Sequence, residues 1–517
     1  MLNLGVSLLF NFLKRIFNLL DMKKKLFQRK VTMTFFVVFM LLAYDLSGQV
    51  GIGTITPDAS SLLDVVSTSK GMLTPRMTTA QRTAIVSPAN GLMVYDTDLK
   101  SFYHYDTVSA GWVKMATGTD GRLKYKLIKS TDVLATVLAA ELAAGGGTKY
   151  LLDTGTLYEI NGTVTLNLPI ELNNAYLNGQ DSGEDKLVRT TGDLFTGNTG
   201  GTLRVLTLTA SAGNVFNLDG GGTASMVFRD CIVTSSSAVG TIRNFALVFV
   251  SIVQYIGNTN GVTYENISKL LLSNSGWFGN NSGIYERLTG TFALVTKQGG
   301  FSEVVGASTG FDVSSNPNIT GDAVMEGTVF TGTLTTGKYV NPYTVGAYTG
   351  YNFNNNWSVR CPGIPTEIDA SAVGDFSVDY AVGSGATTSF NNSNPSNIVK
   401  VQGVSASSNL FRFSTDGGVN NRLKYLGKKK RIFQVSGSIS FQVPGIGTYI
   451  IYIAKNGAAV TQYKIYGRGL AANDILVLPL NASVELNNND YVEVYAQRYT
   501  GGVNDAIVTP NMTLIVK

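Results

Sequence analysis

Short apolar runs separated by Gly, Asn, Ser and Thr fill the middle of the chain, from about residue 118 to residue 340. Several runs end at intervals of 21, 23 and 23 residues, at Phe228, Phe249, Leu272 and Val295. A second series lies between them at intervals of 20 and 22 residues: Ile242, Val262 and Ile284. Two out-of-phase series with one repeat length predict a right-handed parallel β-helix, with about 22 residues and two or three strands per coil. Because one coil cannot bury its apolar face alone, the coils are expected to stack into a single core.

Asparagines fall at the predicted corners of the coils, where this side chain tolerates left-handed turns and forms hydrogen-bond ladders. The set is Asn258, Asn260, Asn266, Asn274, Asn280 and Asn281. Ahead of the repeats, residues 133–144 predict one short helix that ends at Gly145, Gly146 and Gly147. We expect this helix to cap one end of the solenoid.

Alternating apolar and polar positions recur from residue 409 to residue 517, in about ten short segments typical of strands. Turn residues separate them, and Asn456-Gly457 is the clearest hairpin signal. This pattern predicts a jelly-roll sandwich as a C-terminal head over residues 406–517. Residues 341–405 are aromatic and rich in Asn, and they are interpreted as a neck between the shaft and the head.

Residues 50–117 predict a small module of strands, one helix and hairpins. A strand is expected at residues 62–66, and Thr78 or Thr79 is suited to cap a short helix over residues 80–85. Residues 92–96 form the next predicted strand, and the following aromatic segment predicts a further hairpin.

Residues 1–49 are interpreted as a leader. A basic segment at residues 22–30 precedes an apolar stretch at residues 31–44, and the small residues Ser47 and Gly48 follow. This order is typical of a secretory signal peptide, whereas an uncleaved membrane anchor is the alternative. A mature protein that begins at Gln49 or Val50 would indicate secretion, and an intact N-terminus would indicate attachment to a virion or a membrane.

The N-terminal module resembles one that begins secreted surface proteins of Gram-negative bacteria, and modules of phage tail-fibre-like proteins. The motifs are VGIGT at 50–54, KGMLTPRMT at 70–78, Gln81-Arg82 and GLMVY at 91–95. The middle resembles β-helical stretches of phage tail fibres and appendages, in LYEINGTVTLNLPIELNNAYLNG at 157–179, FNLDGGG at 216–222 and FRDCIV at 228–233. The resemblance implies display on a surface or filament, and it implies no chemistry.

The C-terminal part resembles the heads of fibre proteins that share the fold of C1q and tumour-necrosis-factor trimers. The matching segments are VSGSISFQV, YIIYIAKNGAAV and NNDYVEV, at residues 435–443, 449–460 and 488–494. This resemblance implies a homotrimer with aromatic strand faces buried between subunits. Six tyrosines are candidates for that interface: Tyr449, Tyr452, Tyr463, Tyr466, Tyr491 and Tyr495.

Composition leaves little room for metal or acid–base chemistry, because the chain holds one histidine and two cysteines among 517 residues. Cys/His zinc sites, iron–sulfur clusters and a disulfide scaffold are thereby excluded. His104 lies between two tyrosines and is interpreted as a hairpin residue, while Cys231 and Cys361 are widely separated. We predict no catalytic site, no cofactor-binding site, no metal site and no cofactor. The sequence does not indicate which residues bind a partner.

Three patterns that suit chemistry have simpler interpretations. Glycoside hydrolysis needs two facing carboxylates, but the sequence singles out no pair among Asp219, Asp230, Glu265 and Glu286. These four are interpreted as solvated charges at the corners of the coils. Residues 306–310 (GASTG) match a nucleophile elbow, yet the text that follows is rich in turns rather than helical. A basic run either binds an acidic glycan or nucleic acid, or forms a solvated strand edge: Arg422, Lys424, Lys428, Lys429, Lys430 and Arg431.

The net charge of +5 resides entirely in the leader. Residues 1–49 contain seven basic and two acidic side chains, so residues 50–517 hold 33 of each sign. A neutral body gives no electrostatic reason to expect nucleic acid as a partner.

The sequence therefore predicts an all-β chain with a leader (1–49), an attachment module (50–117), a parallel β-helix shaft (118–340), a neck (341–405) and a jelly-roll head (406–517). The favoured function is a non-enzymatic, homotrimeric fibre or adhesin whose head binds a cell-surface receptor, expected to be a glycan. A β-helical polysaccharide depolymerase and a purely structural surface component are the alternatives. The leader favours a secreted bacterial surface protein, and the middle and head favour a virion appendage; membrane contact is expected only through an uncleaved leader.

Overall fold

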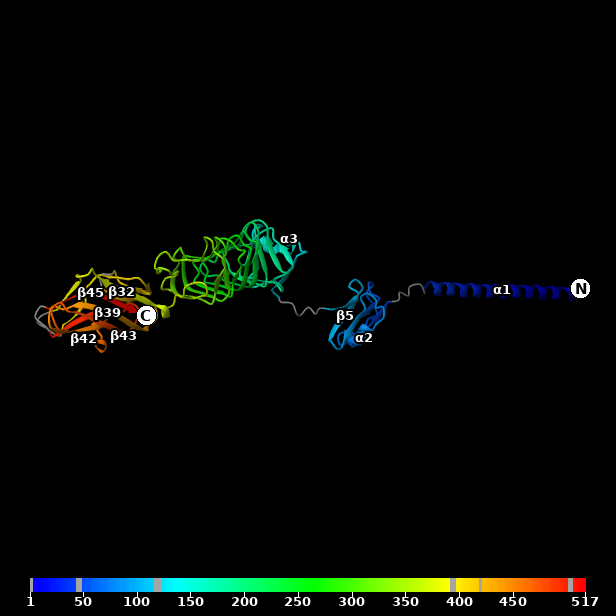
Figure 1. The fold of residues 1–517 in the computed structure, drawn as a ribbon. Helices are drawn as coiled ribbons and strands as arrows, with labels where there is room; N and C mark the ends of the chain where they lie inside the picture. Colours follow the sequence, from blue (N-terminus) through cyan, green and yellow to red (C-terminus); the bar gives the residue numbers. More distant parts are fainter. Residues whose placement is uncertain (1–2, 43–48, 116–122, 391–396, 418–420, 501–504) are drawn as a thin grey trace. The chain divides into compact units, whose positions relative to one another are not determined.

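The computed structural model describes residues 3–42, 49–115, 123–390, 397–417, 421–500 and 505–517. The chain divides into two compact units, Met1–Gly121 and Arg122–Lys517 (Figure 1). The predicted boundary between module and shaft, at residues 117 and 118, lies outside the described residues, as do Ser47 and Gly48.

The first unit begins with a single long helix, α1 (Asn3–Leu42), which contains both the basic and most of the apolar segment of the predicted leader. Its side chains are exposed from residue 11 to residue 39. Of the helices in the described part of the chain, none combines the length and the apolar composition that a membrane span requires.

The N-terminal module contains two small sheets and one short helix. Its elements are β1 (Val50–Ile52), β2 (Leu63–Val65), β3 (Arg76–Met77), α2 (Thr79–Thr83), β4 (Met93–Asp96), β5 (Ser101–Asp106) and β6 (Gly111–Lys114). The predicted hairpins are present, because β4, β5 and β6 pair antiparallel in that order. Thr78 rather than Thr79 caps α2, and its hydroxyl and the Gln81 side chain form a reciprocal capping box.

A buried ion pair holds the helix of the module to its sheet. The Arg82 Nε donates to Asp96 Oδ2 at 2.9 Å, and the guanidinium lies 4.1 Å from the ring centroid of Tyr103. Asp96 also accepts from the Thr79 hydroxyl and the Leu99 amide. Burial raises the pKa of Asp96, but these hydrogen bonds outweigh it and hold the pKa at about 2.

The second unit begins with a shaft of parallel strands in two long sheets. One sheet has sixteen strands: β7 (Tyr125–Lys129), β9 (Leu157–Asn161), β10 (Thr163–Thr165), β12 (Tyr176–Asn178), β13 (Lys186–Arg189), β15 (Gly201–Arg204), β16 (Thr207–Ala210), β18 (Ser225–Thr234), β20 (Leu247–Ile256), β22 (Lys269–Ser273), β23 (Gly276–Trp277), β25 (Thr291–Gln298), β26 (Phe301–Glu303), β28 (Asn318–Glu326), β29 (Val329–Thr331) and β31 (Trp357–Arg360). The other has nine: β8 (Tyr150–Leu151), β11 (Ile170–Glu171), β14 (Phe195–Gly197), β17 (Asn214–Asp219), β19 (Ala238–Arg243), β21 (Val262–Glu265), β24 (Ile284–Thr289), β27 (Thr309–Asp312) and β30 (Lys338–Asn341). Each strand pairs with its equivalent on the next coil, so the predicted parallel β-helix is confirmed (Figure 1).

The register corrects the predicted row of stacked residues. Phe228 pairs with Val250, and Val250 pairs with Leu272, whereas Phe249 pairs with Leu271. Phe249 is therefore one position out of the predicted row, and the alternation of side chains along a strand turns it outward. Leu272 then pairs with Lys297, which shows that the next coil is longer.

The interior of the shaft is one continuous apolar core with a few polar groups. The rings of Tyr255 and Trp277 stack at 3.9 Å, and Tyr285 continues the stack at 5.1 Å. A fully buried ion pair joins Lys297 Nζ to Glu286 Oε2 at 2.7 Å, whereas the sequence predicts a solvated corner charge at Glu286. Its predicted exposure is wrong because its strand position turns it inward, where only a paired charge is tolerated.

The first coil is capped as predicted, but by two short helices rather than one. They are α3 (Leu134–Val137) and α4 (Ala139–Ala144). Leu138 between them is fully buried in the shaft core. Glu141 of α4 is buried as well, and it accepts a hydrogen bond from the Tyr158 hydroxyl at 2.7 Å. Gly146 and Gly147 follow with positive φ, which ends the helix.

Asparagines form the corner ladder that the sequence predicts. Asn281 donates to the Tyr255 and Phe278 carbonyls at 2.7 and 2.8 Å, and its Oδ1 accepts from the backbone and side-chain amides of Asn258. Both side chains are buried. Elsewhere at the corners, Asn266 has a φ of 50°. The ladder thus joins successive coils through buried amide groups, which need these hydrogen bonds because solvent does not reach them.

The C-terminal head is a sandwich of two seven-stranded sheets whose strands all pair antiparallel (Figure 1). The first sheet has β32 (Val373–Asp379), β33 (Ala386–Ser389), β35 (Ser405–Ala406), β36 (Leu410–Phe411), β39 (Arg431–Gln442), β43 (Ile475–Leu486) and β45 (Ala506–Val516). The second has β34 (Ile398–Lys400), β37 (Phe413–Ser414), β38 (Arg422–Tyr425), β40 (Gly447–Lys455), β41 (Ala458–Ala459), β42 (Ile465–Gly469) and β44 (Tyr491–Thr500). Two single-turn helices complete it, η1 (Asp369–Ser371) and η2 (Thr461–Tyr463). The head is the predicted jelly-roll-like sandwich with one apolar core.

The predicted neck does not exist as a separate segment. Of residues 341–405, β31 pairs with β28 and belongs to the shaft, whereas β32 pairs with β45 and belongs to the head. Phe376 and Val378 of β32 are buried in the core of the head. The head thus begins near Val373 rather than at residue 406, because its first strand pairs with the last strand of the chain.

We predict that Asp96 makes the N-terminal module sensitive to acid. Its pKa falls from the ordinary 3.8 to about 2, so the stability from the charged form is complete above about pH 4 and is lost as the pH falls towards 2. The rate of pepsin cleavage within residues 76–114 of the full chain, divided by the rate of pepsin on an unfolded substrate at the same pH, should therefore increase as the pH falls from 4 to 2. The Asp96→Asn variant should be cleaved readily at both pH 4 and pH 2. Equal, pH-independent cleavage of the two proteins would contradict this assignment.

We also expect Asn281→Ala to lower the free energy of unfolding by about 2–4 kcal/mol, because it leaves the backbone amide of buried Asn258 without its acceptor and removes three further hydrogen bonds. Urea denaturation followed by tryptophan fluorescence measures this loss. Asn280→Ala is the matched control: its side chain is exposed and accepts one hydrogen bond from the Gly257 amide, so we expect a cost below about 1 kcal/mol. Equal costs for the two variants would show that the ladder does not stabilise the shaft.

Candidate functional site

The outer face of the second sheet of the head carries most of the tyrosines that the sequence singles out. Ile451 and Ile453 point into the core, so Tyr452 between them points to the other side of the sheet, where it is only 4% exposed. Its hydroxyl donates to Gln497 Oε1 at 2.6 Å, and Tyr495 lies directly opposite on β44. We name this face the tyrosine face and define it by Tyr452, Tyr466, Tyr491, Tyr495 and Tyr499.

Two of the six predicted interface tyrosines lie elsewhere. Tyr449 is fully buried in the core of the sandwich, packed against Phe390 and Phe441. Tyr463 belongs to η2, and its hydroxyl donates to the Ser483 carbonyl on β43. The alternation along β40 explains the first correction, because a residue three positions from Tyr452 faces the opposite side.

Lys428 of the basic run lies at the joint between shaft and head, whereas Arg422 and Lys424 lie on β38 within the head. Lys428 Nζ donates to the Gly321 carbonyl at 3.0 Å and pairs with Asp322 at 3.2 Å, both on β28. The Arg431 guanidinium donates to the Asp369 carbonyl. Lys430 pairs with Glu485 at 3.2 Å. The run is thus engaged largely by groups of its own chain, which the sequence interpretation did not foresee.

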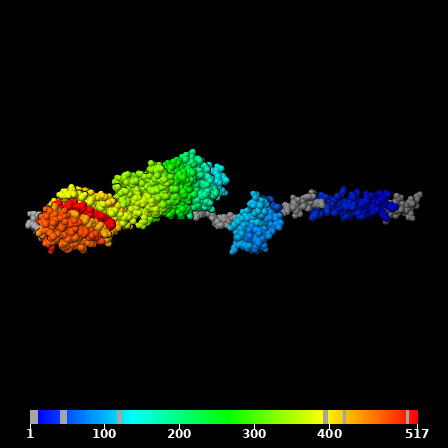
Figure 2. Space-filling model, viewed as in Figure 1, coloured from blue at the N-terminus to red at the C-terminus, as the bar shows by residue number. Residues whose placement is uncertain are grey.

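A buried arginine of the head is the centre of this joint. Arg412 is 1% exposed, and its guanidinium donates to the Asp369 carboxylate. Its second terminal nitrogen donates to the carbonyls of Trp357 and Glu367 at 2.5 and 2.8 Å. Trp357 lies on β31, the last strand of the shaft, so Arg412 fastens the head to the shaft end. Shaft and head lie in contact at this joint in the space-filling view (Figure 2).

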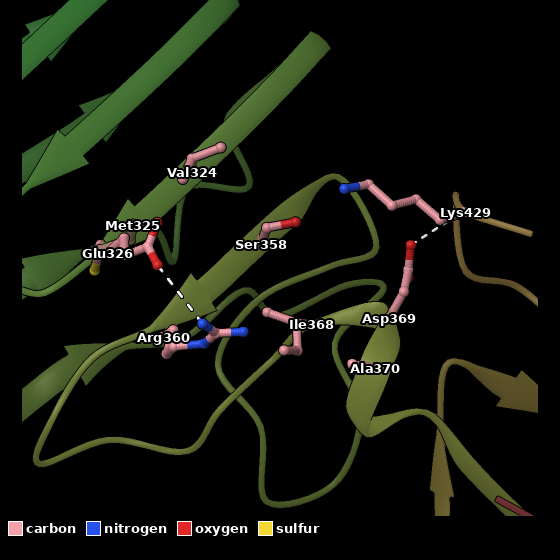
Figure 3. A pocket seen from close by; sticks show the side chains of 9 residues that line it. All are labelled: Val324, Met325, Glu326, Ser358, Arg360, Ile368, Asp369, Ala370 and Lys429. Carbon is pink, nitrogen blue, oxygen red and sulfur yellow. Dashed lines mark hydrogen bonds and ion pairs between the residues drawn. The ribbon is translucent and has the colours of Figure 1, made fainter. Parts of the chain in front are cut away.

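A cavity of about 370 Å³ opens beside the joint (Figure 3). Asp369 and Lys429 lie on one side, where the Lys429 backbone amide donates to the Asp369 carboxylate at 2.8 Å. Glu326 and Arg360 form an ion pair of 3.8 Å on the other. Charges of both signs line this cavity and most already have partners, so it offers no net charge to a ligand.

Of the four carboxylates weighed for glycoside hydrolysis, three form ion pairs with basic side chains. Asp219 pairs with Arg243 at 3.0 Å, and Asp230 pairs with Arg229 at 2.8 Å. Hydrogen bonds from Asn244 and Arg243 lower the pKa of Asp219, which is the opposite of what a general acid needs. Glu265 is the last residue of β21 and is in register with Arg243 of the neighbouring strand β19. Glu286 forms an ion pair with Lys297 inside the shaft.

The remaining chemical candidates occupy structural positions. Residues 306–310 join β26 to β27 without a helix, and Ser308 is buried. His104 lies on β5 opposite Met93 and Val113. Cys231 and Cys361 are buried free thiols, and burial raises the pKa of Cys231 to about 12. In the described part of the chain, no cluster of three or more His, Cys, Asp or Glu side chains is suited to hold a metal ion.

Comparison with known proteins identifies the N-terminal part. Residues 51–131 match the family described as phage tail like trimerisation region, which confirms the N-terminal resemblance. Eiger TNF from S. frugiperda matches with 9% identity over 28% of this chain and 92% of its own, at a TM-score of 0.20. The enzymatically active domain of bacteriophage CBA120 tailspike protein 4 matches with 10% identity over 86% of this chain and 77% of its own, at a TM-score of 0.17. Scores this low carry no argument, so the fold rests on the strand pairing; no curated protein matches the chain.

We predict that Arg412→Met lowers the free energy of unfolding by about 3–5 kcal/mol, because it removes the cation paired with the buried Asp369 carboxylate and two hydrogen bonds to backbone carbonyls. Urea denaturation measures the loss, and limited proteolysis near residues 361–372 should reveal a loosened joint. Arg360→Met is the control, since its ion pair is exposed on both sides and contributes about 0–1 kcal/mol. Unchanged stability and proteolysis of Arg412→Met would refute the role of this arginine.

Proposed function

We propose that this chain, which carries a phage tail-like trimerisation region at residues 51–131, forms a homotrimeric fibre- or adhesin-like protein. It is displayed on a virion or cell surface, and its head binds a cell-surface glycan. The observation that carries the proposal is the order of parts in one chain: a trimerisation region, a long parallel β-helix and an antiparallel sandwich.

Trimer formation gives weak binding sites a useful strength. Three heads on one stalk convert the second and third binding events into intramolecular ones, so avidity exceeds the affinity of a single site. A rigid shaft of stacked coils keeps its length without bound partners, because every coil pairs with its neighbours.

The shaft supports association between copies. Its sixteen-stranded sheet carries apolar side chains that point outward on three successive coils and are only half-buried in the single chain: Val227, Phe249 and Leu271. They lie on one row of the sheet, because the register pairs Val227 with Phe249 and Phe249 with Leu271. Such a stripe is suited to burial against a symmetry-related copy.

The tyrosine face supports association in the head. Tyrosines present large, stiff, amphipathic surfaces that are enriched at protein interfaces. Three of its residues lie on β44, and Tyr466 packs edge-on against Tyr499 at 6.2 Å. We assign this face to contacts between subunits.

The absence of enzymatic activity is part of the proposal. Retaining or inverting hydrolysis requires two carboxylates facing a common substrate, one of them with a raised pKa. Asp219 and Asp230 are instead each paired with an arginine, and Glu286 is enclosed in the shaft.

Native mass spectrometry and cell binding test the proposal together. We expect a particle of three times the 55.2 kDa chain mass, which binds host cells and leaves their capsule and lipopolysaccharide at full length. A monomer that binds no cells would refute it. Shortened polysaccharide chains would instead support the depolymerase alternative.

A further inference from the structure

A cleft of about 600 Å³ lies on the side of the joint where loops of the shaft and the head meet. The shaft contributes the segment after β30, and the head contributes the start of β32 and the turn before β36. The lining includes Tyr348, Tyr351, Ser407, Ser408 and Asn409. All of its lining residues are uncharged, whereas charges of both signs line the cavity that contains Asp369 and Lys429.

One wall of the cleft is polar and held in place by a single carboxylate. Asp375 Oδ1 accepts from the Ser407 hydroxyl at 2.8 Å and from the backbone amides of Ser408 and Asn409 at 3.0 and 2.8 Å. Its Oδ2 accepts from the Asn409 side-chain amide at 3.0 Å. Burial raises the pKa of Asp375, but these donors outweigh it and lower the pKa, so the anchor stays charged at neutral pH.

This anchoring decides which groups the polar wall offers to a ligand. The Asn409 amide nitrogen is used by Asp375, which directs the side-chain oxygen of Asn409 away from the carboxylate. The Ser408 side chain and Asn409 are exposed, so a hydroxyl and an amide oxygen face the opening. These groups pair with the hydroxyls of a ligand and favour no ion.

The other wall is aromatic and equally fixed. Tyr351 stacks on Phe411 at 4.1 Å with an interplanar angle of 21°, and Tyr348 packs edge-on against the same ring at 5.4 Å. The Tyr348 hydroxyl donates to Asn355 Oδ1 at 3.0 Å. Phe411 itself is fully buried and precedes Arg412, whose hydrogen bonds to the shaft end hold both walls at a fixed separation.

We propose that this cleft binds a neutral saccharide. The apolar C–H face of a sugar ring matches the tyrosine wall, and its hydroxyl groups match the Ser408 and Asn409 wall; the missing charge disfavours an anionic sugar. The volume suits one or two rings. This inference deepens the glycan binding of the proposed function, on which it rests, and places the site at the joint with the shaft rather than at the far end of the head.

The experiment uses the full chain and a printed panel of neutral oligosaccharides ending in glucose, galactose, mannose or N-acetylglucosamine, with sialyl-lactose as the acidic probe. Affinity for the best neutral probe is then measured by titration calorimetry. We expect Tyr351→Ala and Asn409→Ala each to weaken it about tenfold, while Tyr351→Phe, which keeps the ring, stays within about twofold. Tyr125→Ala, a change at the opposite end of the shaft, is the control and should not alter it.

Asn409→Ala keeps the test independent of folding, because Asn409 is an exposed turn residue whose backbone bond to Asp375 remains. Unchanged affinity of both Tyr351→Ala and Asn409→Ala would overturn the inference, and so would binding confined to sialyl-lactose. A trimer that binds cells but no neutral probe would overturn the inference and leave the proposed function standing. A monomer that binds no cells would instead refute the proposed function.

Discussion

The structure depends on backbone pairing between successive coils of the shaft. Each strand of a coil bonds only to the equivalent strand before and after it, so a coil is stable only in a stack. The same register places side chains above one another, which builds the Tyr255–Trp277 stack and the buried Asn258–Asn281 ladder. Parallel pairing thus determines which side chains are buried and which point outward. It also leaves the first and last coils without a pairing partner on one side, so that each needs a cap.

The two ends of the stack are closed in different ways. At the first coil, α3 and α4 cover the core, and Glu141 is held by Lys126 and Tyr158. At the last coil, the head itself is the cap, and the Arg412 guanidinium donates to the carbonyls of Trp357 and Glu367. Most of the described basic side chains near this joint therefore bind the chain's own carboxylates and carbonyls, and the neighbouring cleft is left uncharged.

The different uses of charged and uncharged side chains are consistent with the proposed display on a surface. The ion pairs and charged hydrogen bonds described above mostly join parts of the chain to one another. Residues 50–517 hold 33 basic and 33 acidic side chains, so their formal net charge is zero. Under the proposed function, apolar and tyrosine-rich faces contact other copies, and selectivity rests on short-range contacts with hydroxyl groups and rings, which three copies multiply.

The sequence by itself determined the class of each part: the coil length, the corner asparagines, the cap before the repeats, the hairpins of the module and the strands of the head. These features follow from local periodicity and turn chemistry, which neighbouring residues carry. Only the tertiary structure decided the rest. Phe249 faces outward because its strand pairs one position away from the predicted row, and Glu286 is buried because Lys297 meets it from the next coil. β32 joins the head because it pairs with β45, and Arg412 fastens the joint through the Trp357 carbonyl; both are contacts between distant segments that no local pattern records.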